Sequence, residues 1–169
     1  MPEGTHSGSG VSPQEAGLSA PGGPVGAIAP VLETYSAPET EAFGAELAGM
    51  LRAGDLVLLS GDLGAGKTTL ARGIARALGV GGPVTSPTFT IGQRYRGARG
   101  LVSHLDMYRL AGIEDEEEGL LADYLDGESI VLVEWPAVAL GGLPEPTLAV
   151  TISHLDGDRR RIELRSGTA

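Results

Sequence analysis

Residues 61–68 constrain the fold of this chain more than any other segment, because they match the pattern G-x-x-x-x-G-K-[S/T] at every position. Glycines let such a loop curl so that successive backbone N–H groups point inward and form a nest for an anion. A helix that begins where the loop ends adds its free N–H groups and the positive end of its dipole. The pattern therefore predicts a strand, a phosphate-binding loop and a helix in succession.

Lys67 is the only lysine among 169 residues, and the other basic residues are arginines. A compact ammonium differs from the planar fork of arginine, so position 67 indicates a need for a point charge. We expect Lys67 to reach the terminal phosphates of a nucleotide and the Thr68 hydroxyl to ligate magnesium. The alternative is a plain glycine-rich turn, since the chain has 27 glycines. An apolar run before the loop and a helical pattern after it favour the phosphate loop.

Composition limits the classes of function. The net charge is −10 and the sequence pI is about 4.6, which disfavours autonomous binding along a nucleic acid. The absence of cysteine excludes disulfides, cysteine-ligated zinc and a thiol nucleophile. The N-terminus lacks the pattern of a secretory signal, and no apolar run is long enough to span a bilayer. We therefore expect a cytoplasmic protein without membrane contact.

The chain is predicted to form one domain over residues 31–169, preceded by a disordered tail over residues 1–30 that is rich in Gly, Pro and Ser. Apolar runs alternate with helical patterns, which indicates an α/β fold: a three-layer P-loop NTPase-like domain with a largely parallel central sheet and antiparallel edge hairpins. The predicted strands cover 31–35, 55–60, 84–95, 101–106, 129–134, 148–153 and 160–164. The predicted helices cover 36 to about 54, 67–78 and 114–125, and hairpin turns are expected at 97–100 and 156–157.

Two acids, Asp106 and Glu134, each end an apolar strand-like run. A phosphate loop needs a carboxylate at the end of a neighbouring strand to organise magnesium. The alternative is a helix N-cap or a solvated strand end, and it is weaker for Glu134 because Trp135 and Pro136 follow. We expect Glu134 to hold the metal or its bound water, and Asp106 to organise the attacking water or the surroundings of the metal.

Other segments carry weaker signals. Residues 86–90 lie where phosphate-loop hydrolases often place a loop that senses the terminal phosphate, although a proline-stiffened strand entry explains them equally well. His104 and His154 sit in apolar strand patterns and are expected to be structural. The acidic run 114–118 is typical of a solvated helix start. One of the arginines 159–161 is a candidate to lie over a nucleotide base, but solvation is the default.

Four segments together resemble one family, the bacterial TsaE (YjeE) ATPases. They are residues 61–69 (GDLGAGKTT), 86–90 (SPTFT), 104–110 (HLDMYRL) and 134–136 (EWP), in this order and spacing. The resemblance extends over roughly residues 35–165 and leaves the N-terminal tail uncovered. It implies a magnesium-dependent ATPase that docks on a TsaB–TsaD assembly and supports formation of threonylcarbamoyladenosine beside the tRNA anticodon. The chain would meet tRNA only indirectly, through that complex.

The resemblance also implies roles for individual residues. Asp106, Glu134 and Trp135 would be needed for hydrolysis, and residues 86–88 would form a switch-like loop. Magnesium would be held by Thr68 and Glu134. ATP would be contacted by Thr40, Asp62, Leu63, Gly64, Ala65, Gly66, Lys67, Thr68, Thr69 and Arg160, with Arg159 and Arg161 as alternatives to Arg160.

Two rival functions remain open from the sequence. A small-molecule kinase would need an arginine-rich lid, for which Arg94, Arg96 and Arg99 are the clustered candidates. A binding module would use the nucleotide only to set the shape of a docking surface. A GTPase switch is disfavoured, because a chain whose single lysine is Lys67 has no Asn-Lys-x-Asp base-reading motif. Basal hydrolysis is expected to be slow, since no arginine finger lies near the loop in sequence.

Overall fold

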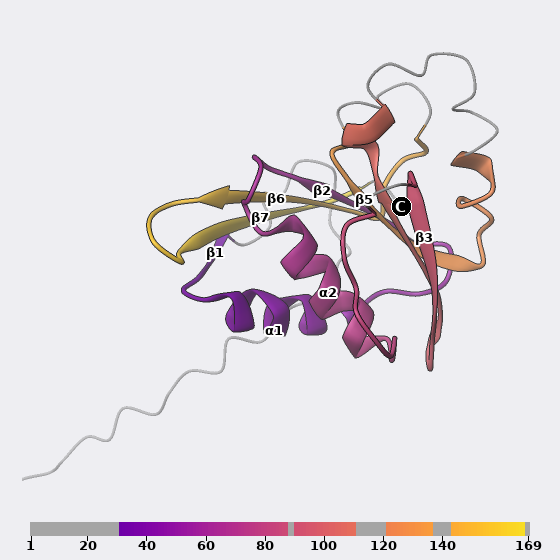
Figure 1. The fold of residues 1–169 in the computed structure, drawn as a ribbon, viewed down its shortest axis with the longest axis horizontal. Helices are drawn as coiled ribbons and strands as arrows, with labels where there is room; N and C mark the ends of the chain where they lie inside the picture. The colour runs from indigo at the N-terminus through magenta and orange to yellow at the C-terminus, as the bar shows by residue number, and fades with distance from the viewer. Residues whose placement is uncertain (1–30, 88–89, 111–120, 137–142, 168–169) are drawn as a thin grey trace, which may run out of the picture.

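The computed structural model describes residues 31–87, 90–110, 121–136 and 143–167. They form an open sheet with two long helices on one of its faces (Figure 1). The elements, in chain order, are β1 (Val31–Thr34), α1 (Ala37–Ala48), β2 (Leu56–Ser60), α2 (Lys67–Ala77), β3 (Gly92–Gly97), β4 (Gly100–Asp106), the 3-10 helix η1 (Met107–Leu110), β5 (Ser129–Glu134), β6 (Leu148–His154) and β7 (Arg160–Ser166).

The seven strands follow the order β1-β7-β6-β2-β5-β4-β3. The four central strands, β6, β2, β5 and β4, are parallel to one another. At the edges, β3 pairs antiparallel with β4, β7 pairs antiparallel with β6, and β1 pairs antiparallel with β7. Every residue of β5 is buried, as expected for a continuous apolar run in the middle of a parallel sheet. The predicted fold class is confirmed, including the two edge hairpins.

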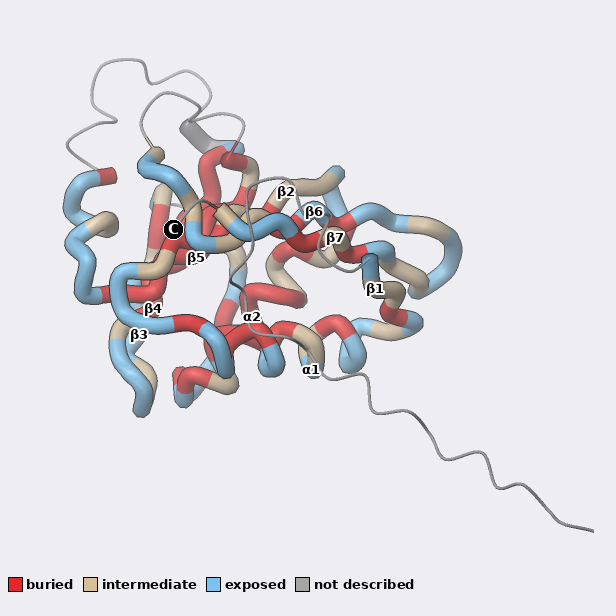
Figure 2. Tube along the Cα trace, turned by 180° about the vertical axis from the view of Figure 1, so that it is seen from behind, coloured by how far each residue is buried: buried red, intermediate tan, exposed pale blue. Residues whose placement is uncertain are grey.

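Helices α1 and α2 pack against each other and against the same face of the sheet (Figures 1 and 2). Their backbones approach closely at Gly44 and Gly73: a Cβ at Gly73 would lie 2.1 Å from the carbonyl oxygen of Glu41. Leu47, Leu70 and Ile74 are fully buried beneath the sheet. This close packing fixes the distance and orientation between α1 and α2.

The opposite face of the sheet is covered by a second apolar cluster. Its buried members include Leu105, Met107, Leu121 and Val133, and partly buried Tyr124 packs against them. These residues supply the described part of the third layer. The helix predicted over residues 114–125 lies mainly outside the described residues, which include helical structure there only at 121–122.

Two element boundaries were predicted wrongly. The strand predicted over residues 84–95 begins only at Gly92, and residues 84–87 have no regular structure, since Pro83 and Pro87 lack an N–H for a strand ladder. The first helix ends at Ala48, with Gly49 as its C-cap, and does not continue to about residue 54. Its predicted start is confirmed: the Ser36 side chain accepts a hydrogen bond from the backbone N–H of Glu39 at 3.3 Å.

The tail predicted over residues 1–30 lies outside the described residues. Within the described residues, no helix combines the length and the apolar character that crossing a membrane requires. The loop between β2 and α2 lies beside the carboxyl ends of the parallel strands β4 and β5, the edge at which open α/β sheets bind ligands. The described fold therefore brings the predicted loop and the two predicted acids to one place.

Candidate functional site

The loop at residues 61–66 uses backbone conformations at its glycines that other residues rarely adopt. Gly61 has φ 144° and Gly66 has φ 112°, both in the region that side chains disfavour. A Cβ at Gly61 would also lie 2.2 Å from the carbonyl oxygen of Ile152. Among the described residues, no side chain caps the N-terminus of α2, which begins at Lys67. The loop and the helix start thus form the anion-binding arrangement that the sequence predicts.

Lys67 is enclosed at the mouth of this loop and is only 4% exposed. Its Nζ donates hydrogen bonds to the carbonyl oxygens of Gly61 and Asp62, both at 2.8 Å. The same nitrogen lies 3.8 Å from the centroid of the Trp135 ring, a cation–π contact. The ammonium is thus held at the loop by three partners, ready to contact an anion that enters it.

The electrostatic surroundings of Lys67 act in two directions. Burial lowers the pKa of Lys67 from its ordinary value of 10.5. The negative charges of Glu134, Asp106 and Asp62 partly oppose that change, because they favour the charged form. A buried cation surrounded by carboxylates is placed to neutralise further negative charge, such as that of a phosphate.

Glu134 ends β5 and is 3% exposed. The Thr68 hydroxyl donates to Glu134 Oε1 at 2.8 Å, and His104 Nε2 lies 2.9 Å from the same oxygen. Because Thr68 donates its hydrogen to Glu134, the lone pairs of the hydroxyl oxygen remain for a metal. The carboxylate and the hydroxyl are the hard oxygen ligands that magnesium prefers, so the residues fit this ion.

These residues do not form a complete metal cage by themselves. In the described ranges, no group of three or more His, Cys, Asp or Glu side chains could hold a metal ion. Magnesium usually takes one or two protein ligands and completes its shell with water and substrate phosphates. The arrangement therefore suits a metal that arrives with a nucleotide.

Asp106 ends β4 and lies directly opposite Glu134 in the parallel register. It is 7% exposed, and both carboxylate oxygens accept hydrogen bonds: Oδ2 from the Ser86 hydroxyl and Oδ1 from the backbone N–H of Tyr108 at 3.1 Å. Ser86, from the predicted sensing loop, is thus tied to an acid of the site. Residues 88 and 89 of that loop lie outside the described residues.

Trp135 has an unusual backbone for a large side chain. Its φ is +58°, and it is the only residue other than glycine with a positive φ in the described part of the chain. The ring packs against Tyr108 with centroids 5.1 Å apart, and the backbone N–H donates to the Leu59 carbonyl at 3.2 Å. Such strain is often kept at functional sites, and here it places the ring over Lys67.

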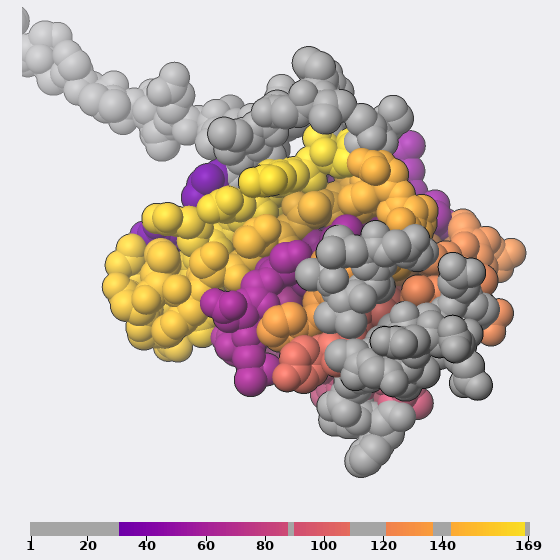
Figure 3. Space-filling view, turned by 90° about the horizontal axis from the view of Figure 1, so that it is seen from above, coloured from indigo at the N-terminus to yellow at the C-terminus, as the bar shows by residue number. Residues whose placement is uncertain are grey.

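These side chains line one hollow of about 260 Å³, here called the loop cleft. In Figure 3, the purple surface of the chain near β2 lies between the yellow β6–β7 hairpin and the red-orange surface that follows β4. The structure thus brings together most of the predicted loop residues, both strand-end acids and Trp135, whereas the predicted Asp62 and Ala65 line neither this hollow nor its neighbour. The loop cleft is lined by Leu63, Gly64, Gly66, Lys67, Thr68, Thr69, Ser86, Asp106, Glu134 and Trp135.

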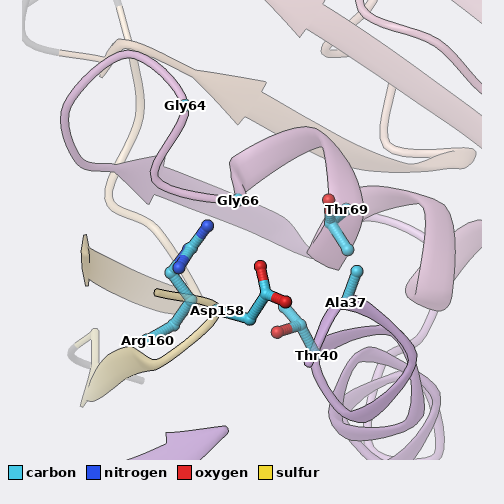
Figure 4. A pocket seen from close by; sticks show the side chains of 7 residues that line it. All are labelled: Ala37, Thr40, Gly64, Gly66, Thr69, Asp158 and Arg160. Atoms are coloured by element: carbon cyan, nitrogen blue, oxygen red, sulfur yellow. The ribbon is translucent and has the colours of Figure 1, made fainter. Parts of the chain in front are cut away.

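A second hollow, here called the hairpin pocket, adjoins the loop cleft. It is lined by Ala37, Thr40, Gly64, Gly66, Thr69, Asp158 and Arg160 (Figure 4). Asp158 and Arg160 come from the β6–β7 hairpin, and their charged groups point toward the start of α2 (Figure 4). Thr40 is buried, and its hydroxyl is bonded to Thr34 Oγ1 at 2.8 Å and to the Ser36 carbonyl at 3.1 Å.

The structure distinguishes among the three adjacent arginines. Arg159 and Arg161 both form ion pairs with Glu33 on β1, at 3.0 and 3.2 Å. Arg160 alone of the three lines the hairpin pocket. Asp158 was not predicted as a site residue, although its place in a hairpin turn two residues before Arg160 is a usable signal.

The two histidines differ in their surroundings. His154 lies on the surface, where its Nε2 is 2.8 Å from the Gly157 carbonyl oxygen. His104 is completely buried and contacts Glu134, so it belongs to the site although its sequence pattern indicated only a core position. The usable signal was its spacing of two from Asp106, which puts both side chains on one face of β4.

Comparison with known proteins agrees with this geometry. The family model described as "Threonylcarbamoyl adenosine biosynthesis protein TsaE" matches residues 34–162. The chain belongs to the TsaE family. A Streptomyces coelicolor relative named "tRNA threonylcarbamoyladenosine biosynthesis protein TsaE" is 48% identical over 117 residues, which are 68% of this chain and 79% of the relative. A Haemophilus influenzae protein of the same name is 45% identical over 113 residues, 67% of this chain and 71% of that protein.

The fold is also that of a solved structure. The crystal structure of Bacillus subtilis YdiB superimposes with a TM-score of 0.69 at 33% identity, covering 82% of this chain and 85% of that one. The matched TsaE region, residues 34–162, spans the whole site from Thr40 to Arg160. The resemblance inferred from the four sequence segments is therefore confirmed.

Proposed function

We propose that this TsaE-family chain binds ATP with Mg²⁺ across the loop cleft and the hairpin pocket and hydrolyses it. The hydrolysis would serve, as an accessory activity, the complex that forms threonylcarbamoyladenosine beside the anticodon of tRNA. One observation carries the nucleotide part: Thr68, at the start of α2, donates to the buried strand-end carboxylate of Glu134 beside Lys67. The tRNA part follows from family membership.

Each residue has a distinct task in this proposal. The loop N–H groups and Lys67 bind the phosphates, while Thr68 and Glu134 hold the metal. Bound magnesium would neutralise charge on the phosphates and polarise them. Asp106, opposite Glu134 in the sheet, accepts hydrogen bonds through both oxygens and is fixed in place to orient the attacking water. Catalysis of this kind consists mainly of positioning and electrostatic stabilisation.

The hairpin pocket would receive the nucleoside. It adjoins the loop at Gly64 and Gly66, so a nucleotide with phosphates in the loop would place its sugar and base beside Thr40 and Arg160. Arg160 offers a planar cation that stacks on an aromatic base, whereas Thr40 sits at the opposite wall on α1.

Partner subunits would supply the contact with tRNA and complete the catalytic site. A net charge of −10 disfavours direct contact with the phosphate backbone of tRNA, so TsaB- and TsaD-type subunits would make that contact. They would also complete or reshape the site, and slow hydrolysis by the isolated chain is expected. The chain would act in the cytoplasm, where tRNA is modified.

The kinase alternative finds little support in the arginines that are candidates for a lid. Arg94 pairs with Asp126 at 3.0 Å, and Arg99 donates to the Ala48 carbonyl at 3.3 Å. Neither residue lines the loop cleft or the hairpin pocket. A nucleotide-dependent binding module without turnover is the stronger rival, and experiment can separate it from the ATPase.

The test compares ATP affinity with ATP turnover in wild type and Glu134→Ala. Trp135 is the only tryptophan and lies 3.8 Å from Lys67 Nζ, so its fluorescence reports on binding at the loop. We expect magnesium-dependent turnover, measured with and without the partner subunits, to fall about 100-fold or more in the variant. Glu163→Gln is the matched control, because Glu163 lies on β7, which β6 and β2 separate from β5 in the sheet. Equal turnover in Glu134→Ala and wild type would refute a catalytic role, and rapid phosphorylation of a small acceptor would indicate a kinase.

A further inference from the structure

His104 is a buried polar residue that has no role in the hydrolysis proposed above. It is 0% exposed, and it does not line the loop cleft. Its Nε2 lies 2.9 Å from Glu134 Oε1, the same oxygen that accepts the Thr68 hydroxyl at 2.8 Å. His104 therefore cannot touch a nucleotide, but it touches the residue proposed to hold the metal.

The second ring nitrogen reveals which nitrogen carries the hydrogen. His104 Nδ1 is buried, and no described residue offers it a hydrogen bond. An unpaired buried N–H is rarer and costlier than an unpaired lone pair. A carboxylate oxygen only accepts, so the hydrogen that binds Glu134 must come from Nε2. The contacts thus favour the tautomer of His104 in which Nε2 carries the hydrogen and donates it to Glu134.

We infer that His104 is a positioning residue that fixes the carboxylate of Glu134 against Thr68 and so prepares the metal site before the nucleotide arrives. This inference rests on the proposed function. Two donors on one carboxylate oxygen hold the rotation of the Glu134 side chain, which a single donor would leave freer. The outer partners of metal ligands orient those ligands in the same way in many metal sites.

The competing explanation is that His104 only fills space in the core. Its ring does lie on the α2 side of the sheet, and its register partner on β5 is the fully buried Leu132. A residue that served packing alone would be replaceable by leucine with no change in the response to metal. If His104 positions Glu134, leucine should change the response to metal, because leucine has no hydrogen-bond donor for Glu134.

Three variants separate these explanations. His104→Leu removes the donor and keeps an apolar side chain, whereas His104→Gln offers an amide N–H near the position of Nε2. Ser103→Ala is the control: Ser103 is equally buried on β4, faces the other side of the sheet and bonds to Ser129 Oγ at 3.1 Å. Thermal unfolding identifies any variant that fails to fold.

The readout is the gain in ATP affinity that magnesium provides, from titrations of Trp135 fluorescence with Mg²⁺ and with EDTA. We expect His104→Leu to reduce this gain about 10- to 100-fold while metal-free affinity stays unchanged. His104→Gln should recover most of the gain, and Ser103→Ala should retain all of it. A wild-type gain in a folded His104→Leu, or a folded His104→Gln no better than His104→Leu, would overturn the inference.

A second measurement needs no nucleotide. Long-range ¹H–¹⁵N spectra of the imidazole should show hydrogen on Nε2 of His104, with a signal that moves in Glu134→Ala. A hydrogen found on Nδ1 instead would overturn the inference. Wild-type protein without ATP hydrolysis would refute the proposed function yet leave this spectrum unaffected, so the two failures are distinguishable.

Discussion

The loop cleft and the hairpin pocket adjoin each other but are built from different parts of the sheet. In the loop cleft, Lys67, Asp106 and Glu134 are 4%, 7% and 3% exposed, and the two acids end the central parallel strands β4 and β5. In the hairpin pocket, Asp158 is exposed and Arg160 is half-buried, and both come from the antiparallel β6–β7 hairpin.

This difference has an energetic consequence. Charges that are buried and hydrogen-bonded interact strongly with a ligand, because they are screened little and are already oriented. Exposed charges on a hairpin are screened by water and lose side-chain entropy when they bind. We therefore expect substitutions in the loop cleft to cost much more binding energy than substitutions in the hairpin pocket.

The largest effect on binding is expected at Lys67. Lys67→Ala removes a charged donor enclosed by the loop and should weaken ATP affinity roughly 10- to 100-fold. Lys67→Arg should recover little of it, because the planar fork of arginine does not fit where Nζ sits 2.8 Å from two loop carbonyls. Isothermal titration calorimetry measures both. Wild-type ATP affinity in Lys67→Arg would contradict the claim that the loop encloses the Lys67 ammonium too tightly for a guanidinium.

The dependence of binding on pH should come from the same residue. Burial lowers the pKa of Lys67 from 10.5, and phosphate binding needs the charged form. ATP affinity should therefore fall as the pH rises through that lowered pKa, before an exposed lysine would lose its proton. Arg160→Ala should show the same fall, since the loop cleft and not the hairpin pocket causes it.

The stability of the ligand-free protein should change with pH in the opposite sense. The folded pKa of Lys67 is lower than the unfolded one, so between the two values the unfolded state binds more protons. The free energy of unfolding gains a contribution that rises with pH across that window. Denaturation curves recorded at several alkaline pH values measure it, and Lys67→Ala should abolish this part of the pH dependence.

The next largest effect, on stability, is expected at the contact between α1 and α2, the two helices that carry lining residues of the hollows. Gly73 lies on α2 with Lys67 and Thr68, and it packs on α1, which carries Thr40. Gly73→Ala would force a Cβ to within 2.1 Å of the Glu41 carbonyl oxygen, and should cost about 1–3 kcal/mol of the free energy of unfolding. Gly81→Ala, where a Cβ would meet nothing within 4 Å, is the control. Equal stability of the two variants would contradict the close packing of the helices.

The smallest effect is expected at Arg160. Arg160→Ala should weaken ATP affinity about 3- to 10-fold, because its guanidinium is partly exposed to water. Arg161→Ala, on the neighbouring residue that pairs with Glu33 at 3.2 Å, should change the affinity less than about twofold. A loss of ATP affinity in Arg160→Ala as large as that in Lys67→Ala would contradict the claim that the loop cleft contributes more binding energy than the hairpin pocket.

Much of the fold was predictable because the relevant signals are local. The apolar run at residues 129–134 and the Gly97–Gly100 turn fix a strand and a hairpin from their own residues. The start of β3 was not predictable in this way, since the prolines at 83 and 87 outweigh an apolar pattern that favours strand. The helix predicted over residues 114–125 stays largely a prediction.

The site also contains some features that local sequence predicts and others that it does not. The loop at residues 61–68 is a contiguous motif, and Asp106 and Glu134 come together because carboxyl ends of parallel strands meet at one edge. Asp158 and the contact between His104 and Glu134 depend on how distant segments pack, which no local pattern contains. The resemblance already favoured Arg160, and the structure adds the reason that sequence could not give: Glu33 on β1 pairs with both of its neighbours.

The most direct test of the account is reconstitution with TsaB- and TsaD-type subunits, tRNA and ATP, scoring threonylcarbamoyladenosine in the tRNA over many turnovers. We predict that wild-type chain sustains its formation, and that Glu134→Ala sustains no more than a reaction without the chain. Modification by Glu134→Ala at the wild-type level, or full modification without the chain, would contradict the claim that ATP hydrolysis in the loop cleft supports this reaction.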